Sequence, residues 1–375
     1  MNKKNLKNNK TKIILLICSI IVGFICVTFT HYDAFLYKSS IGEVIKVTHS
    51  KTVEVQDEYN NTDYKTKQQL LVKVLNGKYK NKNLYINNTY TYSGALDVPY
   101  HTHQQVLMSI SRVNNKLTGN INGPKRDTIV VFTIWLAISL TLLFLCKSGI
   151  LALLSIVING ILFYFAICWD LKLNGVNVLS IFCGLAILFA IMTLFMVLGF
   201  NKSFLIAFSA TIGGTFLAIL IGSAVMFITH DKGMYFESMA YVTQLPRPLF
   251  HAEALLGSLG AVMDIIMDMV ATLTQVCKER PDLTHKQVFI TARNIGHNIM
   301  GPLVNVLFLI FIGCTLPMAI LYLRNDNSIA YTFKFVMSLG IVESLISGVG
   351  IALAVLLTEI LSAWIMGRGE KGVNN

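Results

Sequence analysis

Eight long apolar runs constrain this chain more than any other feature of its sequence. Each is close to, or longer than, the roughly 20 residues that an α-helix needs to cross the hydrocarbon core of a bilayer. The runs cover 13–30, 128–146, 150–169, 177–200, 204–229, 252–277, 302–323 and 329–366. Of the 375 residues, 54% are hydrophobic and 14% are charged, a balance too apolar for a water-soluble globule. The sequence therefore predicts an α-helical polytopic membrane protein with about eight transmembrane helices.

The basic residues indicate how these helices are oriented. They gather in residues 1–12, at Lys147 and Lys202, in the stretch 278–293 and in the tail 368–375. Eight crossings that start from a cytoplasmic N-terminus place all of these groups on the cytoplasmic side, as the positive-inside rule requires. The net charge of +11 therefore reflects membrane orientation, and it predicts no nucleic-acid partner.

The first run predicts an uncleaved anchor. A cleaved signal peptide is the alternative, but residues 13–30 are long for its apolar core, and the exit through His31, Tyr32 and Asp33 lacks a small-x-small cleavage pattern. Residues 31–127 then lie outside the cytoplasm. Our expected order is a basic N-terminus (1–12), the anchor (13–30), an outer domain (31–127), four helices (128–229), an outer loop (230–251), three helices with a cytoplasmic link (252–367) and a cytoplasmic tail (368–375).

The segment 31–127 differs in kind from the apolar runs. Apolar and polar residues alternate over 70–74, the turn pair Asn76-Gly77 follows, and apolar residues resume at 84–86. Another strand is predicted at 106–110. Alternation of period two around a turn pair is typical of β-hairpins, so we expect a small extracytoplasmic β-domain, a barrel or a sandwich, between the first two helices.

Polar residues inside the apolar runs are expensive and are therefore candidates for function. In the sixth run they recur every three or four residues, which places them on one helix face: Glu253, Gly257, Gly260, Asp264, Asp268, Ala271 and Gln275. Asp264 and Asp268 are one turn apart, so they can carry a proton or a cation. Alternatively, partners inside the bundle hold both aspartates and fix the helix register.

A second stripe enters the seventh run with the same spacing, at Asn294, Asn298, Gly301 and Asn305, and we expect it to complete the aspartate face. The last run carries Glu343 and Glu359, and its length predicts a break near Gly340 or Gly348. The predicted ion-coupling or transport residues are Asp264, Asp268, Asn294, Asn298, Asn305 and Glu343. The predicted helix-packing residues are Gly257, Gly260, Gly301 and Gly348.

Motifs of enzymes and metal sites are missing from the sequence. The triplet 251–253 lacks the second histidine of HExxH, and no GxSxG or Walker A stretch occurs. The seven cysteines show no CxxC spacing, and His101 with His103 gives only two ligands. We therefore expect no catalytic residues, no cofactor and no metal.

Two stretches carry a family resemblance, namely GSLGAVMDIIMD at 257–268 and NIMGPLVNVLFLIFIGCTLP at 298–317, followed by Glu343 and SLISGVGIALAV. They resemble the YibE/F family of bacterial polytopic membrane proteins, which implies a bacterial plasma membrane. Asp264 matches the family motif. The chain departs from it at Asn298 and Pro302, where Asp and Thr are common, and at Leu356, where Pro is common. The layout is also distantly similar to the membrane domains of SecF and RND-type proteins.

Two functions remain open from the sequence. The first is a transporter or ion-coupled permease component that uses protons or sodium ions. The second is a non-transporting scaffold or sensor whose outer β-domain binds an envelope component or a protein. The expected partners are the lipid bilayer and a second membrane protein or further copies of the chain.

Overall fold

The structure is a computed structural model that describes residues 3–94, 97–113, 116–173, 175, 177–239 and 245–368. The predicted tail after Arg368 lies outside the described residues. Two compact units, Met1–Ile150 and Leu151–Asn375, make up the chain. Within the described residues, eight helical segments are long and apolar enough to cross a membrane: Ile17–Leu36, Asp127–Leu145, Gly149–Lys172, Val178–Leu198, Lys202–Thr229, Pro246–Glu279, His285–Arg324 and Ile329–Met366. The predicted number of such helices is confirmed.

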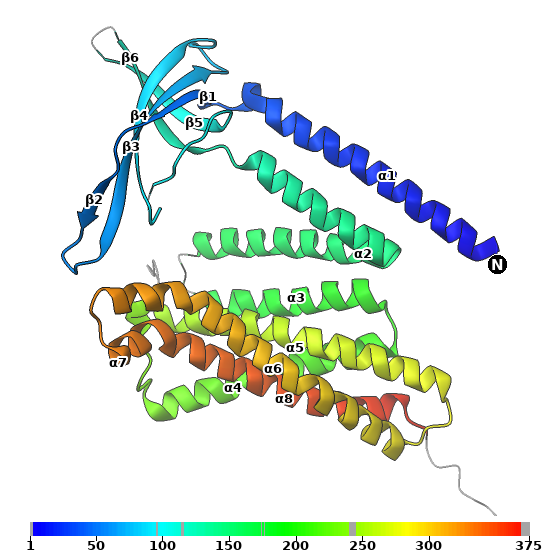
Figure 1. Ribbon diagram of the computed structural model, residues 1–375. Coiled ribbons are helices and arrows are strands. Elements are labelled where there is room, and N and C mark those ends of the chain that lie inside the picture. The colour runs from blue at the N-terminus through cyan, green and yellow to red at the C-terminus, as the bar shows by residue number, and fades with distance from the viewer. Residues whose placement is uncertain are drawn as a thin grey trace, which may run out of the picture. The chain divides into compact units, whose positions relative to one another are not determined.

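The first unit is a β-domain between two helices (Figure 1). Its elements are α1 (Lys3–Tyr32), the short η1 (Asp33–Leu36), β1 (Ser40–His49), β2 (Val53–Gln56), β3 (Thr62–Val74), β4 (Asn83–Thr91), β5 (Gln105–Val113), β6 (Lys116–Pro124) and the first part of α2 (Asp127–Lys172).

All strand pairs are antiparallel. β1 pairs with β3 and β5, β3 also pairs with β2 and β4, and β5 pairs with β6. Alternate residues of β3, among them Leu70, Val72 and Val74, are fully buried in one core, as strand geometry requires. Ile86 of β4 and Ile121 of β6 close over this core, so the sheet curls into a half-barrel. The predicted β-domain is thus confirmed.

The pair Asn76-Gly77 does not form a two-residue turn in the β3–β4 hairpin but lies within a longer loop. This loop runs over 75–82, and Gly77 has a φ of +73° that favours glycine. Asn76 is buried, and its side chain donates to the carbonyls of Ala34, at 2.7 Å, and Ser39, at 3.0 Å. It also accepts from the backbone N–H of Ile41 at 2.6 Å. Asn76 therefore ties the hairpin loop to the chain that leaves α1.

Helix α2 carries two of the apolar segments. A Cβ added at Gly149 would lie 2.8 Å from the carbonyl oxygen of Thr141, whereas eight residues of straight helix rise about 12 Å. The helix therefore bends sharply between these residues, where the sequence predicts a break between two spans.

The second unit is a helical bundle (Figure 1). It contains the rest of α2, α3 (Val178–Leu198), α4 (Lys202–Thr229), η2 (Phe236–Ser238), α5 (Pro246–Glu279), α6 (His285–Arg324), α7 (Ile329–Thr332), η3 (Phe333–Met337) and α8 (Ser338–Met366). Helix α5 contacts α3, α4, α6 and α8. Its residues Leu255, Val262, Ile266 and Leu273 are fully or almost fully buried, so α5 forms the centre of the core.

The predicted break in the last run lies elsewhere. Helix α8 runs unbroken through Gly340 and Gly348, and the irregular stretch is the π-helical η3 before it. Gly340 instead makes room for the ring of Phe311 on α6. Helix α6 also begins inside the predicted cytoplasmic link, because Thr284 and Gln287 form a capping box that starts it there.

Candidate functional site

Helix α5 has one buried and one open face. Leu255, Val262 and Ile266 lie on the buried face. The residues of the polar stripe are all exposed and make up the open face: Glu253, Gly257, Gly260, Asp264, Asp268, Ala271 and Gln275. Among the described residues, neither Asp264 nor Asp268 has an ion-pair partner. The structure thus keeps the two carboxylates on one open helix face, one turn apart.

At one end of this face lies a cavity of about 930 Å³, here called the carboxylate cleft. Glu253 of α5 and Glu343 of α8 both line it, and the hydroxyl-bearing residues Thr315, Ser344 and Ser347 add polar atoms. Apolar residues such as Phe250, Leu307 and Phe311 form much of the remaining wall. The cleft therefore presents two carboxylates from two helices inside an otherwise largely apolar wall.

Gly257 is what lets Glu343 reach this position. A Cβ at residue 257 would lie 2.6 Å from Oε1 of Glu343, so the carboxylate occupies space that glycine leaves free and would have to shift if any other residue stood there. Two carboxylates in one cleft repel each other when both are ionised, and a shared proton or a bound cation relieves that repulsion. Such a pair of carboxylates has the chemistry to hold a proton or a cation.

A second cavity, of about 850 Å³, lies between α6 and α8 and is here called the amide cavity. Its lining consists of Phe289, Arg293, Asn294, His297, Asn298, Met300, Ala352, Val355, Leu356 and Glu359. No lining residue comes from α5. The structure therefore brings Asn294 and Asn298 beside Glu359 of α8 rather than onto the aspartate face, while Asn305 is exposed on α6 and lines neither cavity.

The predicted packing glycines differ in their surroundings. At Gly260, Gly301 and Gly348, an added Cβ would meet no atom of the described chain within 4 Å. Close approach of helices inside the described chain therefore does not explain these three glycines. Their packing role stays a prediction, as do the transport roles of the polar residues.

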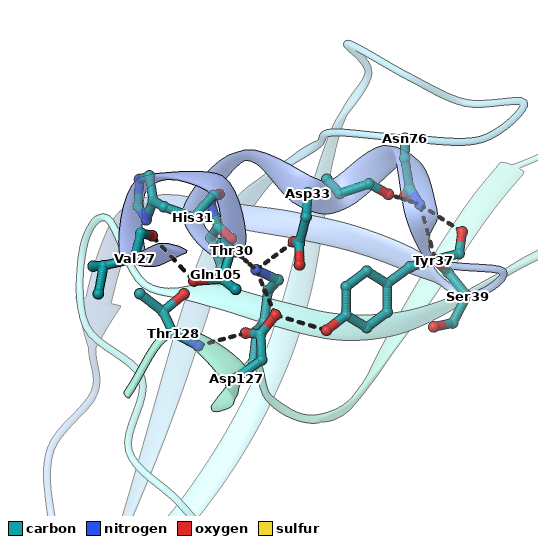
Figure 2. Close-up of polar contacts among 12 residues, drawn as sticks. Val27, Thr30, His31, Asp33, Tyr37, Ser39, Asn76, Gln105, Asp127 and Thr128 are labelled. Carbon is teal, nitrogen blue, oxygen red and sulfur yellow. Dashed lines mark hydrogen bonds and ion pairs between the residues drawn. The ribbon is translucent and has the colours of Figure 1, made fainter. Parts of the chain in front are cut away.

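A third polar cluster lies in the first unit, where α1, the half-barrel and α2 meet (Figure 2). The Lys125 ammonium lies 2.8 Å from Asp33 Oδ1 and 3.0 Å from Asp127 Oδ2, and its side chain is only 1% exposed. It also donates to the carbonyl of Thr30 at the end of α1. The Tyr37 hydroxyl donates to Asp127 Oδ2 at 2.7 Å. One amine therefore binds both helices to the base of the β-domain.

The sequence predicts neither that Glu253 and Glu343 line the same cleft nor that Lys125 lies in a polar cluster. Spacing within one run shows which residues share a helix face, but not which face of another helix lies opposite. Lys125 and Asp127 precede a predicted span, where charged residues usually mark only the helix end.

Apolar helices of this number, with a half-barrel between the first two, give the chain the architecture of a multi-pass membrane protein. Comparison with protein families agrees. The model described as YibE/F-like protein matches residues 133–368, and that of the YibE/F family N-terminal domain matches residues 35–124. The chain belongs to the YibE/F family, as its resemblance predicts. Neither the curated proteins nor the solved structures gave a match.

Proposed function

We propose that this YibE/F protein is an ion-coupled transporter of the bacterial plasma membrane, or the membrane component of one. In this proposal the carboxylate cleft binds the coupling proton or sodium ion, and both termini lie in the cytoplasm. The observation that carries the proposal is the meeting of Glu253 and Glu343 in one cleft at the end of the aspartate face of α5. The proposal assigns no enzymatic activity.

The cost of these carboxylates supports an active role. An aspartate at the centre of a membrane helix costs roughly 2.5–3.5 kcal/mol on insertion scales, and an acidic residue nearer the end of the helix costs less. Glu253, Asp264, Asp268 and Glu343 all lie within helices long and apolar enough to span a membrane. An anchor for the β-domain requires none of them, whereas passage of a cation along α5 requires a succession of negative groups.

The test is ion flux in liposomes that contain the purified protein and either a pH-sensitive or a sodium-sensitive dye. We expect wild-type protein to dissipate an imposed proton or sodium gradient, and Glu343→Gln to lower the rate to that of protein-free liposomes, because the amide keeps the shape and loses the charge. Glu279→Gln is the matched control. Glu279 lies at the exposed end of α5, outside the cleft, and the amide oxygen of the variant can still accept the hydrogen bond that Gln275 donates to Glu279 Oε1 at 2.7 Å.

Equal rates for Glu343→Gln and Glu279→Gln, with equal amounts of inserted protein, would contradict the proposal. They would favour the alternative in which the chain is a scaffold or sensor and the outer β-domain binds an envelope component or another protein. Asp264→Asn extends the test along α5, since in the transporter proposal it also reduces the flux.

A further inference from the structure

The amide cavity between α6 and α8 holds opposite charges that do not pair with each other. Arg293 and Glu359 both line it, yet no ion pair within 4.0 Å joins them. Glu359 is only 8% exposed. No hydrogen bond or ion pair holds its carboxylate among the residues that the structure describes.

A carboxylate buried this deeply requires a counter-charge or hydrogen-bond donors close by. A ligand in the cavity can supply them, because the carboxylate faces about 850 Å³ of open space. That volume falls within the range of small-molecule sites, so a group larger than a single ion fits there.

The charges of the cavity define the ligand. A metal cation near Glu359 meets the positive charge of Arg293, and a simple anion near Arg293 meets the negative charge of Glu359. A zwitterion satisfies both, with an ammonium group at Glu359 and a phosphate or carboxylate at Arg293. Asn294, His297 and Asn298 lie beside Arg293 on α6 and add hydrogen-bond donors for the anionic group.

The rest of the lining favours an amphiphile over a small soluble zwitterion. Met300, Ala352, Val355 and Leu356 are apolar, and Ala352 and Leu356 are exposed at the bundle surface. Arg293 belongs to the predicted cytoplasmic link, whereas Ala352 and Leu356 lie in a run long and apolar enough to span a membrane, so in the inserted protein this open side extends from the head-group region towards hydrocarbon. An acyl chain leaving the cavity over these residues buries its methylenes against them.

We propose that the amide cavity binds the head group of an aminophospholipid of the phosphatidylethanolamine type. Its ammonium group lies at Glu359, and its phosphate lies among Arg293, His297 and the two asparagines. This site is separate from the carboxylate cleft, and the proposal does not depend on ion transport.

The first test varies the lipid and leaves the wild-type protein unchanged. Purified protein is delipidated, mixed with one lipid at a time, and the bound lipid is counted by native mass spectrometry. We expect phosphatidylethanolamine to bind best, its N-methylated forms to bind progressively less, and phosphatidylcholine and phosphatidylglycerol to bind least. Methylation removes the N–H groups that donate hydrogen bonds to Glu359, and the head group of phosphatidylglycerol carries no ammonium group. Equal binding of the whole series would overturn the proposal.

The second test varies the protein. Glu359→Gln is expected to abolish the preference for phosphatidylethanolamine over phosphatidylcholine. Arg293→Gln is expected to weaken the binding of both lipids. Glu279→Gln and Lys286→Gln are the matched controls, because both residues are exposed and lie outside the cavity. A preference that survives in Glu359→Gln overturns the assignment of the ammonium position.

Competition by soluble glycerophosphoethanolamine distinguishes a membrane lipid from a soluble zwitterion with the same head group. In the lipid proposal it fails to displace bound phosphatidylethanolamine at equal concentration, because it lacks the acyl chains that contact Met300 and Val355. Equal competition would assign the cavity to a soluble zwitterion and overturn the lipid proposal.

Discussion

At the scale of single residues, one buried charge holds several elements of the first unit together. This charge belongs to Lys125, whose buried ammonium lies against two carboxylates and a carbonyl. Removing one partner of a buried ion pair costs roughly 3–5 kcal/mol, because it leaves a buried charge without compensation. The side chains of Asp33, Tyr37, Lys125 and Asp127 therefore act as one unit that holds the base of the half-barrel.

Tyr37 provides a pH test of this unit. Its hydrogen bond to Asp127, followed by burial and the nearby negative charge, raises the pKa of Tyr37 from its ordinary value of 10.0 to about 12. A group whose pKa is raised by folding contributes stability that is complete below its unfolded pKa and is lost as the pH rises towards the folded value. The contribution of Tyr37 is therefore present below pH 10 and disappears between about pH 10 and 12.

We expect the tyrosinate absorbance of the full chain, minus that of Tyr37→Phe, to show one tyrosine titrating near pH 12. Thermal unfolding of the two proteins should converge across the same window. Tyr85→Phe is the control, because Tyr85 is 72% exposed on β4. A Tyr37 difference curve centred at pH 10 would show that the hydrogen bond to Asp127 is not formed in solution.

At the scale of elements, the sequence predicts faces better than it predicts contacts. The 3.6-residue period of α5 correctly separates Leu255, Val262 and Ile266 from Asp264 and Asp268, because only one side can pack against α3, α4 and α8. Alternation likewise predicts β3. Helix ends and irregularities are less predictable, since the π-helical stretch 333–337 depends on packing that the local sequence does not encode.

The packing of α4 against α8 gives an element-scale prediction. A Cβ at Gly214 would lie 2.8 Å from the Cα of Ala354, and backbone cannot move aside as a side chain can. Gly214→Ala should therefore force the two helices apart and destabilise the bundle by about 1–3 kcal/mol, the usual cost of overpacking. Gly260→Ala should cost little, because an added Cβ there meets nothing within 4 Å.

The measurement is the thermal unfolding of both variants in the same detergent, followed by size-exclusion chromatography. A Gly214→Ala protein as stable as Gly260→Ala would mean that α4 and α8 lie further apart than this packing requires. A loss of stability confined to Gly260→Ala would instead point to a contact outside the chain at the open face of α5.

For the whole molecule, the sequence predicts the class and much of the layout, and less of the site. Hydropathy gives the eight apolar helices, because lipid solvation imposes run lengths that survive any detail of packing. Alternation of apolar and polar residues around a turn pair gives the β-domain between the first two. The candidate site depends on which helices meet. Glu253 and Glu343 lie on helices separated by the whole of α6, so no local spacing rule joins them, and the amide stripe lines a cavity with α8 for the same reason.

Orientation in the membrane is a prediction at this scale. If the predicted topology is correct and the β-domain lies outside, we expect Tyr85→Cys to react with a membrane-impermeant maleimide in intact cells, and Lys286→Cys to react only after the membrane is permeabilised. Both positions are exposed. Wild-type protein, with its seven native cysteines, sets the background, and labelling of Lys286→Cys in intact cells would reverse the topology.

The buried amine at residue 125 has a mechanical consequence. Because it binds the carbonyl of Thr30, the carboxylate of Asp33 and the carboxylate of Asp127 together, α1 and α2 cannot separate at the ends that adjoin the half-barrel without leaving an ammonium group that has lost its counter-ions. The adjoining ends of α1 and α2 are therefore fixed to each other and to the half-barrel at a single point.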